Sequence, residues 1–203
     1  SQPHANPVRN MHFPGSGVGG HCLPKDTWLL LHGCNEYGKE NFEYNPSILS
    51  GSRHLNDFMP VHTMELLKEA LKEKNKELKD SGICVLSYAF LENSDDPRNT
   101  PTLPCLKKLD AEGISYTLHD PYRKEEDGYQ ISQDLESCLK ESDAVVILTK
   151  HNEYKGLKPD YLGKTMNTHV VIDGRNTLNG DEFVENGFAF RGIGKGQYRR
   201  KSE

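Results

Sequence analysis

From residue 81 onward, short apolar runs alternate with stretches that have the spacing of amphipathic helices. The runs are continuous rather than alternating, which is typical of strands that are buried on both faces. Helices between such strands indicate an α/β fold with a parallel sheet. The predicted strands are 83–86, 116–119, 144–148, 169–173 and 188–190, and the predicted helices are 100–113, 132–141 with Ser132 as N-cap, about 154–164, and a short one from 181.

Residues 1 to about 80 show no convincing strand. Between Arg53 and Leu78, apolar residues recur at helical spacing, and Pro60 interrupts the pattern. Proline lacks the N–H group that a helix interior uses, so we expect a kink at Pro60 or two helices end to end. This change of pattern divides the chain into a helical segment over residues 1–80 and an α/β domain over residues 81–203.

A glycine-rich segment, Gly15-Ser-Gly-Val-Gly-Gly20, leads into Cys22 at the predicted start of a helix. Pro24 suits the first helical turn, and the apolar run from Trp28 continues the helix. Backbone N–H groups at a helix N-terminus favour the thiolate form of a cysteine, which is the nucleophilic form. Asp26 follows Cys22 by one helical turn, so we expect both side chains to face the same space. The pattern indicates covalent thiol chemistry beside a carboxylate.

The same glycines match the dinucleotide-binding pattern G-x-G-x-x-G through Gly15, Gly17 and Gly20. That pattern follows a hydrophobic strand and precedes a second strand that ends in an acidic residue. Here prolines break the preceding segment, and a polar, aromatic segment follows the helix. We therefore reject the dinucleotide-binding interpretation of this loop. Its glycines still let a substrate approach the backbone closely.

The composition narrows the class of protein and of partner. The 203 residues carry a net charge of −5 and no basic cluster that overrides it, which argues against nucleic acid as a partner. No apolar run approaches membrane-spanning length, and there is no signal-peptide pattern, so we expect no membrane partner. The five cysteines are odd in number and lack a C-x-x-C pair, which favours free thiols in a reducing cytoplasm. The histidines lack metal-ligand spacing, so we predict no metal.

Ligands of parallel α/β sheets bind beyond the carboxyl ends of the strands. After the first predicted strand these positions hold Tyr88, Phe90 and Arg98, and after the fourth they hold Arg175. A glycine-flanked arginine beyond a strand favours a ligand contact. The two aromatic side chains fit either a ligand or the core, and Arg98 fits either a ligand or an ion pair with a neighbouring aspartate.

Several segments, taken in order, resemble one enzyme family. Gly17-Val-Gly-Gly-His-Cys22-Leu-Pro-Lys-Asp26 looks like the active-site loop of the nucleotide-sugar 6-dehydrogenases, the UDP-glucose/GDP-mannose dehydrogenase family. The segments Asn56-Asp-Phe-Met-Pro60, 89–101 and Val171-Ile-Asp-Gly-Arg-Asn176 resemble its other motifs. The pair His21-Cys22 is similar to the branch that oxidises UDP-N-acetylhexosamines, such as UDP-N-acetylmannosamine or its galacto relative. The resemblance covers nearly the whole chain.

The resemblance implies a fold and an assembly. The family has an NAD-binding Rossmann domain, a helical middle that pairs two subunits, and a C-terminal Rossmann-like UDP-binding domain. This chain resembles only the end of the middle and the last domain, and it begins with Ser-Gln-Pro-His rather than methionine. We expect it to be the C-terminal portion of such an enzyme, inactive alone, and to form a homodimer or a higher homo-oligomer.

The resemblance also implies roles for single residues. Cys22 would carry the sugar as a thiohemiacetal and then as a thioester, while the C6 alcohol is oxidised with NAD as cofactor. Asp26 would assist the hydrolysis of the thioester. Lys25 and Arg98 would contact NAD. The substrate would be a UDP-sugar, and its predicted contacts are Arg9, Gly15, Gly17, Gly19, Gly20, Tyr88, Phe90, Leu91 and Arg175.

One position departs from the family pattern. Where the family usually has a lysine after the Ala-Phe pair, this chain has Leu91. Part of the substrate binding then stays in doubt, or it falls to a different cation such as Arg9, Arg53 or Lys150.

Three other functions stay open at this point. A non-catalytic nucleotide-sugar or dinucleotide binding module would bind UDP without turnover. A cysteine hydrolase or acyltransferase would use Cys22 with His12 or His21, although no further signature supports it. An interaction protein would assemble through the helix over residues 53–78, which is also compatible with a dimer contact of the dehydrogenase.

Overall fold

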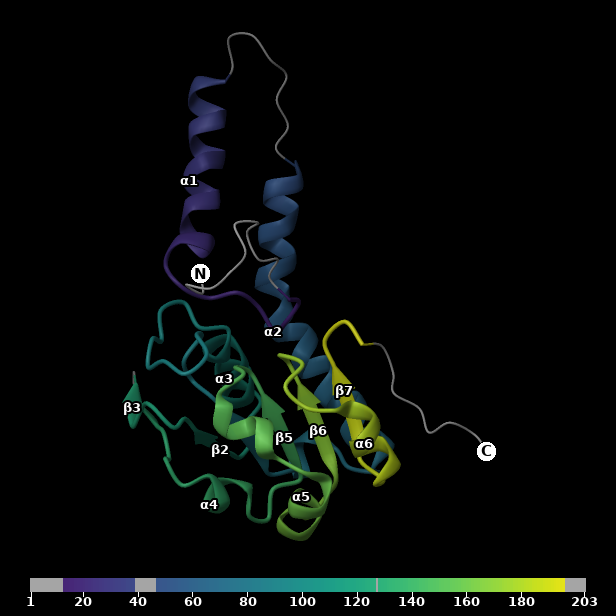
Figure 1. Cartoon of the computed structure of the whole chain (residues 1–203). Coiled ribbons are helices and arrows are strands. Elements are labelled where there is room, and N and C mark those ends of the chain that lie inside the picture. Colours follow the sequence, from purple (N-terminus) through teal and green to yellow (C-terminus); the bar gives the residue numbers. More distant parts are fainter. Residues whose placement is uncertain (1–12, 39–46, 127, 196–203) are drawn as a thin grey trace, which may run out of the picture.

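The computed structural model describes residues 13–38, 47–126 and 128–195 (Figure 1). Its centre is a five-stranded sheet in the order β2-β1-β5-β6-β7, and all neighbouring strands are parallel. The apolar runs predicted all five strands, and the predicted α/β fold is confirmed. The strands are β1 (Ile83–Leu86), β2 (Tyr116–His119), β5 (Ala144–Ile147), β6 (Val170–Asp173) and β7 (Ala189–Gly192).

Successive strand residues enter two separate hydrophobic cores, one on each face of the sheet. On β1, Val85 belongs to the first core and Leu86 to the second. Because both faces are buried, the strands need no polar alternation, and their sequences read as unbroken apolar runs. Helices α2 (Ser47–Glu73) and α3 (Thr102–Ala111) supply the first core, and α4 (Leu135–Leu139), α5 (Pro159–Thr165) and α6 (Gly180–Glu185) supply the second.

Helix α1 (Cys22–Tyr37) lies against the first half of α2, and this pair stands apart from the sheet (Figure 1). The second half of α2 packs on the sheet through Met64, Leu67 and Leu71. Helix α2 therefore contributes to both parts of the molecule, and the division at residue 80 stays a prediction.

The helix pair carries exposed apolar side chains, which include Leu29, Leu30, Ile48 and Leu55. Nothing covers these side chains in the described part of the chain, and the homodimer stays a prediction. No helix of the described residues is long and apolar enough to cross a membrane.

Three predicted helices differ from the structure. The helical pattern over 53–78 corresponds to α2, which ends at Glu73, and Leu78 lies in a separate 3₁₀ turn, Leu78–Asp80. Helix α4 begins after Asp134, whose carboxylate accepts the N–H of Ser137 at 3.1 Å, whereas Ser132 pairs with His119 beside β2. The predicted helix at 154–164 is a 3₁₀ turn over Asn152–Gly156 followed by α5. The separation arises because the residue before Pro159 must be extended.

The sequence pattern left two further features open or missed them: the course of the helix at Pro60 and a short pair of strands. Helix α2 continues through Pro60 as one helix rather than two. A small antiparallel pair, β3 (Glu125–Glu126) and β4 (Tyr129–Gln130), was not predicted, because two-residue strands are too short to show a pattern.

A crevice is expected where the strand order reverses. Strand β2, which follows β1 in the chain, lies on one side of β1, and β5 lies on the other side. In such sheets the loops that follow the two central strands diverge, and ligands bind between them. Thr149, just after β5, donates its hydroxyl to the carbonyl of Ala89 at 2.6 Å and joins the bases of the two loops.

A buried carboxylate holds the loop after β1. Asp120, at the end of β2, accepts the backbone N–H groups of Tyr88 and Ala89 at 2.8 and 3.0 Å. His151 reaches the same loop, where its Nδ1 accepts the N–H of Asn93 at 2.9 Å. Burial raises the pKa of Asp120, but hydrogen bonds from His151 and from three backbone N–H groups outweigh burial and lower the pKa to about 2. The carboxylate is therefore ionised at neutral pH.

The acid stability of the domain should depend on Asp120. Because its folded pKa lies below the unfolded value of about 3.9, its stabilisation is complete above pH 4 and is lost as the pH falls toward 2. We expect Asp120→Asn to lower the free energy of unfolding at pH 7 by about 2 kcal/mol and to flatten its fall between pH 4 and 2. Urea unfolding at several pH values measures both, and the exposed Asp80→Asn is the control. Equal pH slopes in the wild type and in Asp120→Asn would contradict the prediction.

Candidate active site

The glycine loop, residues 15–20, lies between α2 and the carboxyl ends of the strands. At its start, Ser16 donates its N–H to the carbonyl of Gly174 at 3.1 Å. The hydroxyl of Thr63, from α2, donates to Ser16 Oγ at 2.9 Å, and both side chains are fully buried. Ser16 therefore joins the loop to α2 and to the loop after β6.

Further along, two asparagine side chains bind the loop backbone. Asn56 of α2 accepts the N–H of Val18 at 2.8 Å. Asn99, in the loop after β1, donates to the carbonyl of Gly20 at 2.8 Å, and the N–H of Gly20 donates to the carbonyl of Arg98 at the same distance. Both asparagines lie in segments that resemble family motifs, 56–60 and 89–101, but neither residue type nor spacing indicates their contacts with the distant glycine loop.

The glycines have a packing reason for their place. A Cβ atom on Gly19 would lie 2.7 Å from the carbonyl oxygen of Asn99 and 2.7 Å from the Cβ of Phe90. Gly20 has a φ of +94° and lies against the Phe90 ring. A Cβ on Gly15 would meet Arg175, and Gly17 has a φ of +126°. These contacts explain the glycines without a ligand, so their substrate contacts stay a prediction.

Cys22 is the first residue of α1, and its side chain is exposed. The residue before it, His21, makes no side-chain cap. Asp26 lies one turn further along and pairs with Lys25 at 3.1 Å, and both side chains are about half exposed. The arrangement places an accessible thiol, a carboxylate and an ammonium group at one helix end.

Arg98 lies within electrostatic reach of Cys22. Its guanidinium binds the carboxylate of Asp96 through Nε at 2.9 Å and Nη2 at 2.5 Å. The pKa of Arg98 is raised, chiefly by this hydrogen bond and by the charge of Asp96, with a smaller contribution from Cys22. The structure therefore shows the ion pair that the sequence left as one alternative. The exposed position of Arg98 leaves a cofactor contact possible as well.

The strand-end residues fall into two groups. The ring of Tyr88 is 1% exposed and packs in the first core, which was the structural alternative for this residue. Phe90 is half-buried under the glycine loop, and Leu91 is 49% exposed beside it. Arg175 lies next to Gly15, with its Nη2 3.9 Å from Glu92. Phe90, Leu91 and Arg175 thus lie in the loops after β1 and β6, whereas Tyr88 is packed in the core; the ligand contacts of all four stay a prediction.

The other cations proposed for the Leu91 position have their own contacts. Arg53 is buried and forms an ion pair with Asp57, one turn along α2. Lys150 donates to the carbonyl of Asn176 at 2.8 Å. Arg9 lies outside the described residues.

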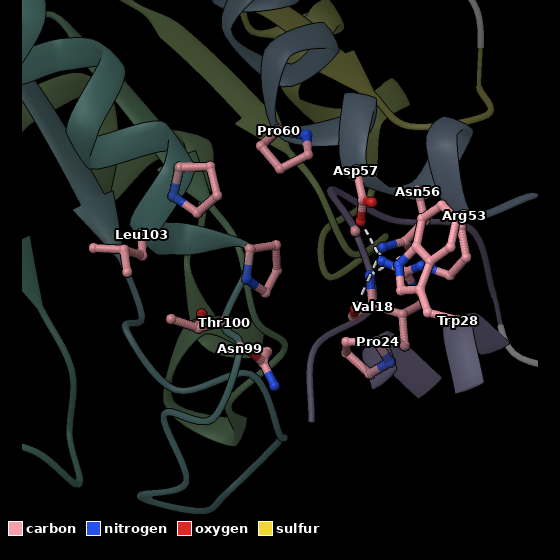
Figure 2. A pocket seen from close by; sticks show the side chains of 13 residues that line it. Val18, Pro24, Trp28, Arg53, Asn56, Asp57, Pro60, Asn99, Thr100 and Leu103 are labelled. Atoms are coloured by element: carbon pink, nitrogen blue, oxygen red, sulfur yellow. Dashed lines mark hydrogen bonds and ion pairs between the residues drawn. The ribbon is translucent and has the colours of Figure 1, made fainter. Parts of the chain in front are cut away.

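A cavity of about 370 Å³ borders the glycine loop (Figure 2). Gly17 and Val18 border it, and Pro24 and Trp28 of α1 also line it. Successive residues of an α-helix are rotated by about 100°. Pro24 and Trp28 are therefore rotated by about 200° about the α1 axis from Cys22 and Asp26, so the two pairs lie on different faces of the helix. Accordingly, Cys22 is not among the residues that line the cavity.

Comparisons with protein-family models match two domains of one family. The UDP binding domain of the UDP-glucose/GDP-mannose dehydrogenase family matches residues 84–180, and the central domain of the same family matches residues 3–57. The matches cover most of the chain.

Individual relatives align with nearly all of the chain. UDP-N-acetyl-D-mannosamine dehydrogenase of Pyrococcus horikoshii is 37% identical over 94% of this chain and 42% of its own length. The protein of that name from Methanococcus aeolicus is 30% identical over 95% of this chain and 42% of its own length. The crystal structure of NDP-N-acetyl-D-galactosaminuronic acid dehydrogenase from Methanosarcina mazei Go1 superposes with a TM-score of 0.84 at 40% identity, over 90% of this chain and 39% of that one. The chain thus spans about two fifths of the length of these relatives.

The five thiols should differ sharply in reactivity. Cys84, Cys105 and Cys138 are buried, and burial raises the pKa of each thiol, that of Cys105 to about 12. Cys22 is exposed, and Cys34 is partly exposed. We expect iodoacetamide at pH 7.5 to label Cys22 first and Cys34 second, with the other three protected until unfolding. Peptide mass spectrometry over time measures the order, and labelling of a buried cysteine before Cys22 would contradict it.

Proposed function

The chain belongs to the UDP-glucose/GDP-mannose dehydrogenase family, and on this premise we propose that it supplies the thiol nucleophile and the UDP-binding domain of an NAD-dependent UDP-sugar 6-dehydrogenase. One observation carries the proposal. Cys22 is exposed on the first residue of α1, at the end of a loop that is bonded to the carboxyl edge of the parallel sheet. This position supports the proposal, because a ligand bound at that edge of the sheet could present a reacting carbon to the thiol.

The proposed substrate is a UDP-N-acetylhexosamine. Two relatives are named UDP-N-acetyl-D-mannosamine dehydrogenase, and a similar solved structure is named for an N-acetylgalactosaminuronic acid. Phe90 and Arg175 at the crevice offer an aromatic face and a guanidinium, which suit a base and a phosphate. Leu91 provides an exposed apolar contact where the family usually has a lysine.

Cys22 is the residue that we propose to carry the sugar. Its thiolate would add to the C6 aldehyde and form a thiohemiacetal, which becomes a thioester when C6 is oxidised a second time. Water would then attack the thioester carbon, releasing the uronate and returning the electron pair to sulfur. A thiolate suits both steps, because it is a good nucleophile and a good leaving group. Asp26, one turn along α1, would accept the proton of the attacking water.

Two cations fit a pyrophosphate near this thiol. Lys25 and Arg98 are both exposed, and each is held in an ion pair at the surface. Such pairs contribute only about 0–1 kcal/mol, so a phosphate can replace the carboxylate partner. NAD, when bound, would accept hydride from the sugar carbon.

Binding of UDP should depend on Arg175 and not on the thiol. A charge-assisted hydrogen bond to phosphate contributes about 1.5–3 kcal/mol, so we expect Arg175→Ala to weaken UDP binding by about tenfold or more. Cys22→Ala should leave it unchanged, because the thiol serves the sugar. Isothermal titration calorimetry with UDP measures both, and Lys107→Ala on the exposed surface of α3 is the control. Similar affinities in the Arg175→Ala and control variants would contradict this placement of UDP.

The chemistry should consume two NAD for each sugar. Oxidation of an alcohol to a carboxylate removes four electrons, so we expect two NADH for each uronate from UDP-N-acetylmannosamine in the enzyme that contains these residues. Cys22→Ala should reduce the rate by at least about a hundredfold, which is the size of effect expected when a covalent nucleophile is lost. Absorbance at the NADH maximum and chromatography of the sugar nucleotide give the ratio. UDP binding without turnover in the whole enzyme would favour the non-catalytic binding module.

A further inference from the structure

The glycine loop cannot fix its own conformation. Four of the six residues from 15 to 20 are glycine, and glycine loses more conformational freedom on folding than any other residue. The cavity of about 370 Å³ borders the loop at Gly17 and Val18. Packing on that side is therefore incomplete, and hydrogen bonds from neighbouring elements must hold the backbone.

Two side-chain amides supply these bonds from opposite sides of the cavity (Figure 2). Asn56 Oδ1 accepts the N–H of Val18 at 2.8 Å, and its Nδ2 lies 3.4 Å from the carbonyl of the same residue. Asn99 Nδ2 donates to the carbonyl of Gly20 at 2.8 Å. A carboxamide both donates and accepts, so it can replace the partners that a loop backbone lacks. Both groups are neutral and hold the loop without adding charge near the thiol.

The second of these bonds lies directly before the nucleophile. Gly20 is two residues from Cys22, and the intervening His21 gives the helix no side-chain cap. The N–H of Gly20 is bonded to the carbonyl of Arg98, so the dipeptide Arg98–Asn99 holds both polar groups of Gly20. The start of α1 is therefore fixed from outside, by the loop that follows β1.

We propose that Asn56 and Asn99 are positioning residues for Cys22. They fix the backbone ahead of the thiol at two points and thereby set its distance from Arg98 and from the crevice. The proposal rests on the proposed function for one point, that the placement of Cys22 serves catalysis. The hydrogen bonds themselves do not depend on any substrate.

The chain offers a matched control for Asn99. Asn93 lies in the same loop with a φ of +54°, close to the +47° of Asn99. Its side chain also binds a distant backbone group, the N–H of Asn152, at 2.9 Å. Glycine adopts positive φ readily, so Asn99→Gly and Asn93→Gly each remove one side-chain bond and keep the backbone conformation. Only the first of these bonds reaches the glycine loop.

The test measures the environment of Cys22 directly in the 203-residue chain. A trifluoromethyl label is attached to Cys22 in a Cys34→Ser background, and its fluorine NMR resonance is compared among the variants. We expect Asn99→Gly and Asn56→Ala to move the resonance toward that of the free labelled thiol, and Asn93→Gly to leave it in place. Hydrogen exchange at the Gly20 amide should accelerate about fivefold in Asn99→Gly, as expected for one hydrogen bond of about 1 kcal/mol.

Thermal unfolding separates positioning from general destabilisation. Both glycine variants should lose similar stability, because each loses one comparable bond. Identical resonances and exchange rates in Asn99→Gly and Asn93→Gly would overturn the proposal. If Asn99→Gly does not fold, Asn99→Asp tests the same bond, because aspartate tolerates positive φ but turns a carboxylate oxygen toward the Gly20 carbonyl. No substrate enters these measurements, so a failure here leaves the Cys22 chemistry untouched, and a failure of turnover leaves the positioning intact.

Discussion

A loop that consists almost entirely of backbone must be held by groups outside it, and this constraint governs the whole arrangement around Cys22. Ser16, Val18 and Gly20 are bonded to three different elements: the loop after β6, helix α2 and the loop after β1. The loop therefore lies correctly only when the sheet and α2 are already packed together. The position of the thiol is a property of the tertiary structure and not of the local sequence.

Neutral groups hold the glycine loop, and charged groups lie at the exposed surface near Cys22. Amides, hydroxyls and carbonyls hold the glycine loop in buried or half-buried places, where an unmade hydrogen bond costs about 1–3 kcal/mol. The charged pairs Lys25–Asp26 and Arg98–Asp96 lie at the exposed rim, where a pair contributes little. The interior is thus fixed and the rim is exchangeable. This division would suit the proposed function, in which Cys22 stays in place while charged ligands bind and leave.

The sequence predicted what depends on local pattern and missed what depends on tertiary contact. All five strands of the main sheet were predicted, because a strand buried on both faces leaves an apolar run. The extents of α4 and α5 were wrong, because Ser132 is taken up by a bridge to β2 and Pro159 forces a new helix start. Tyr88 and Phe90 are two residues apart, yet one enters the core and the other lies under the loop. The contacts of Asn56 and Asn99 were not predicted, although both residues lie in segments that resemble family motifs, because their partners lie 38 and 79 residues away.

Helix α2 has a mechanical consequence for the molecule. Its 27 residues form one continuous helix of about 40 Å. The helix begins in the exposed helix pair and ends in the first hydrophobic core. Asn56 lies in the N-terminal half of this helix and accepts the N–H of Val18. If the N-terminal half of α2 tilted relative to the sheet, the hydrogen bond between Asn56 and Val18 would move the glycine loop that precedes Cys22. The exposed half of α2 is therefore connected through Asn56 to the backbone that precedes Cys22.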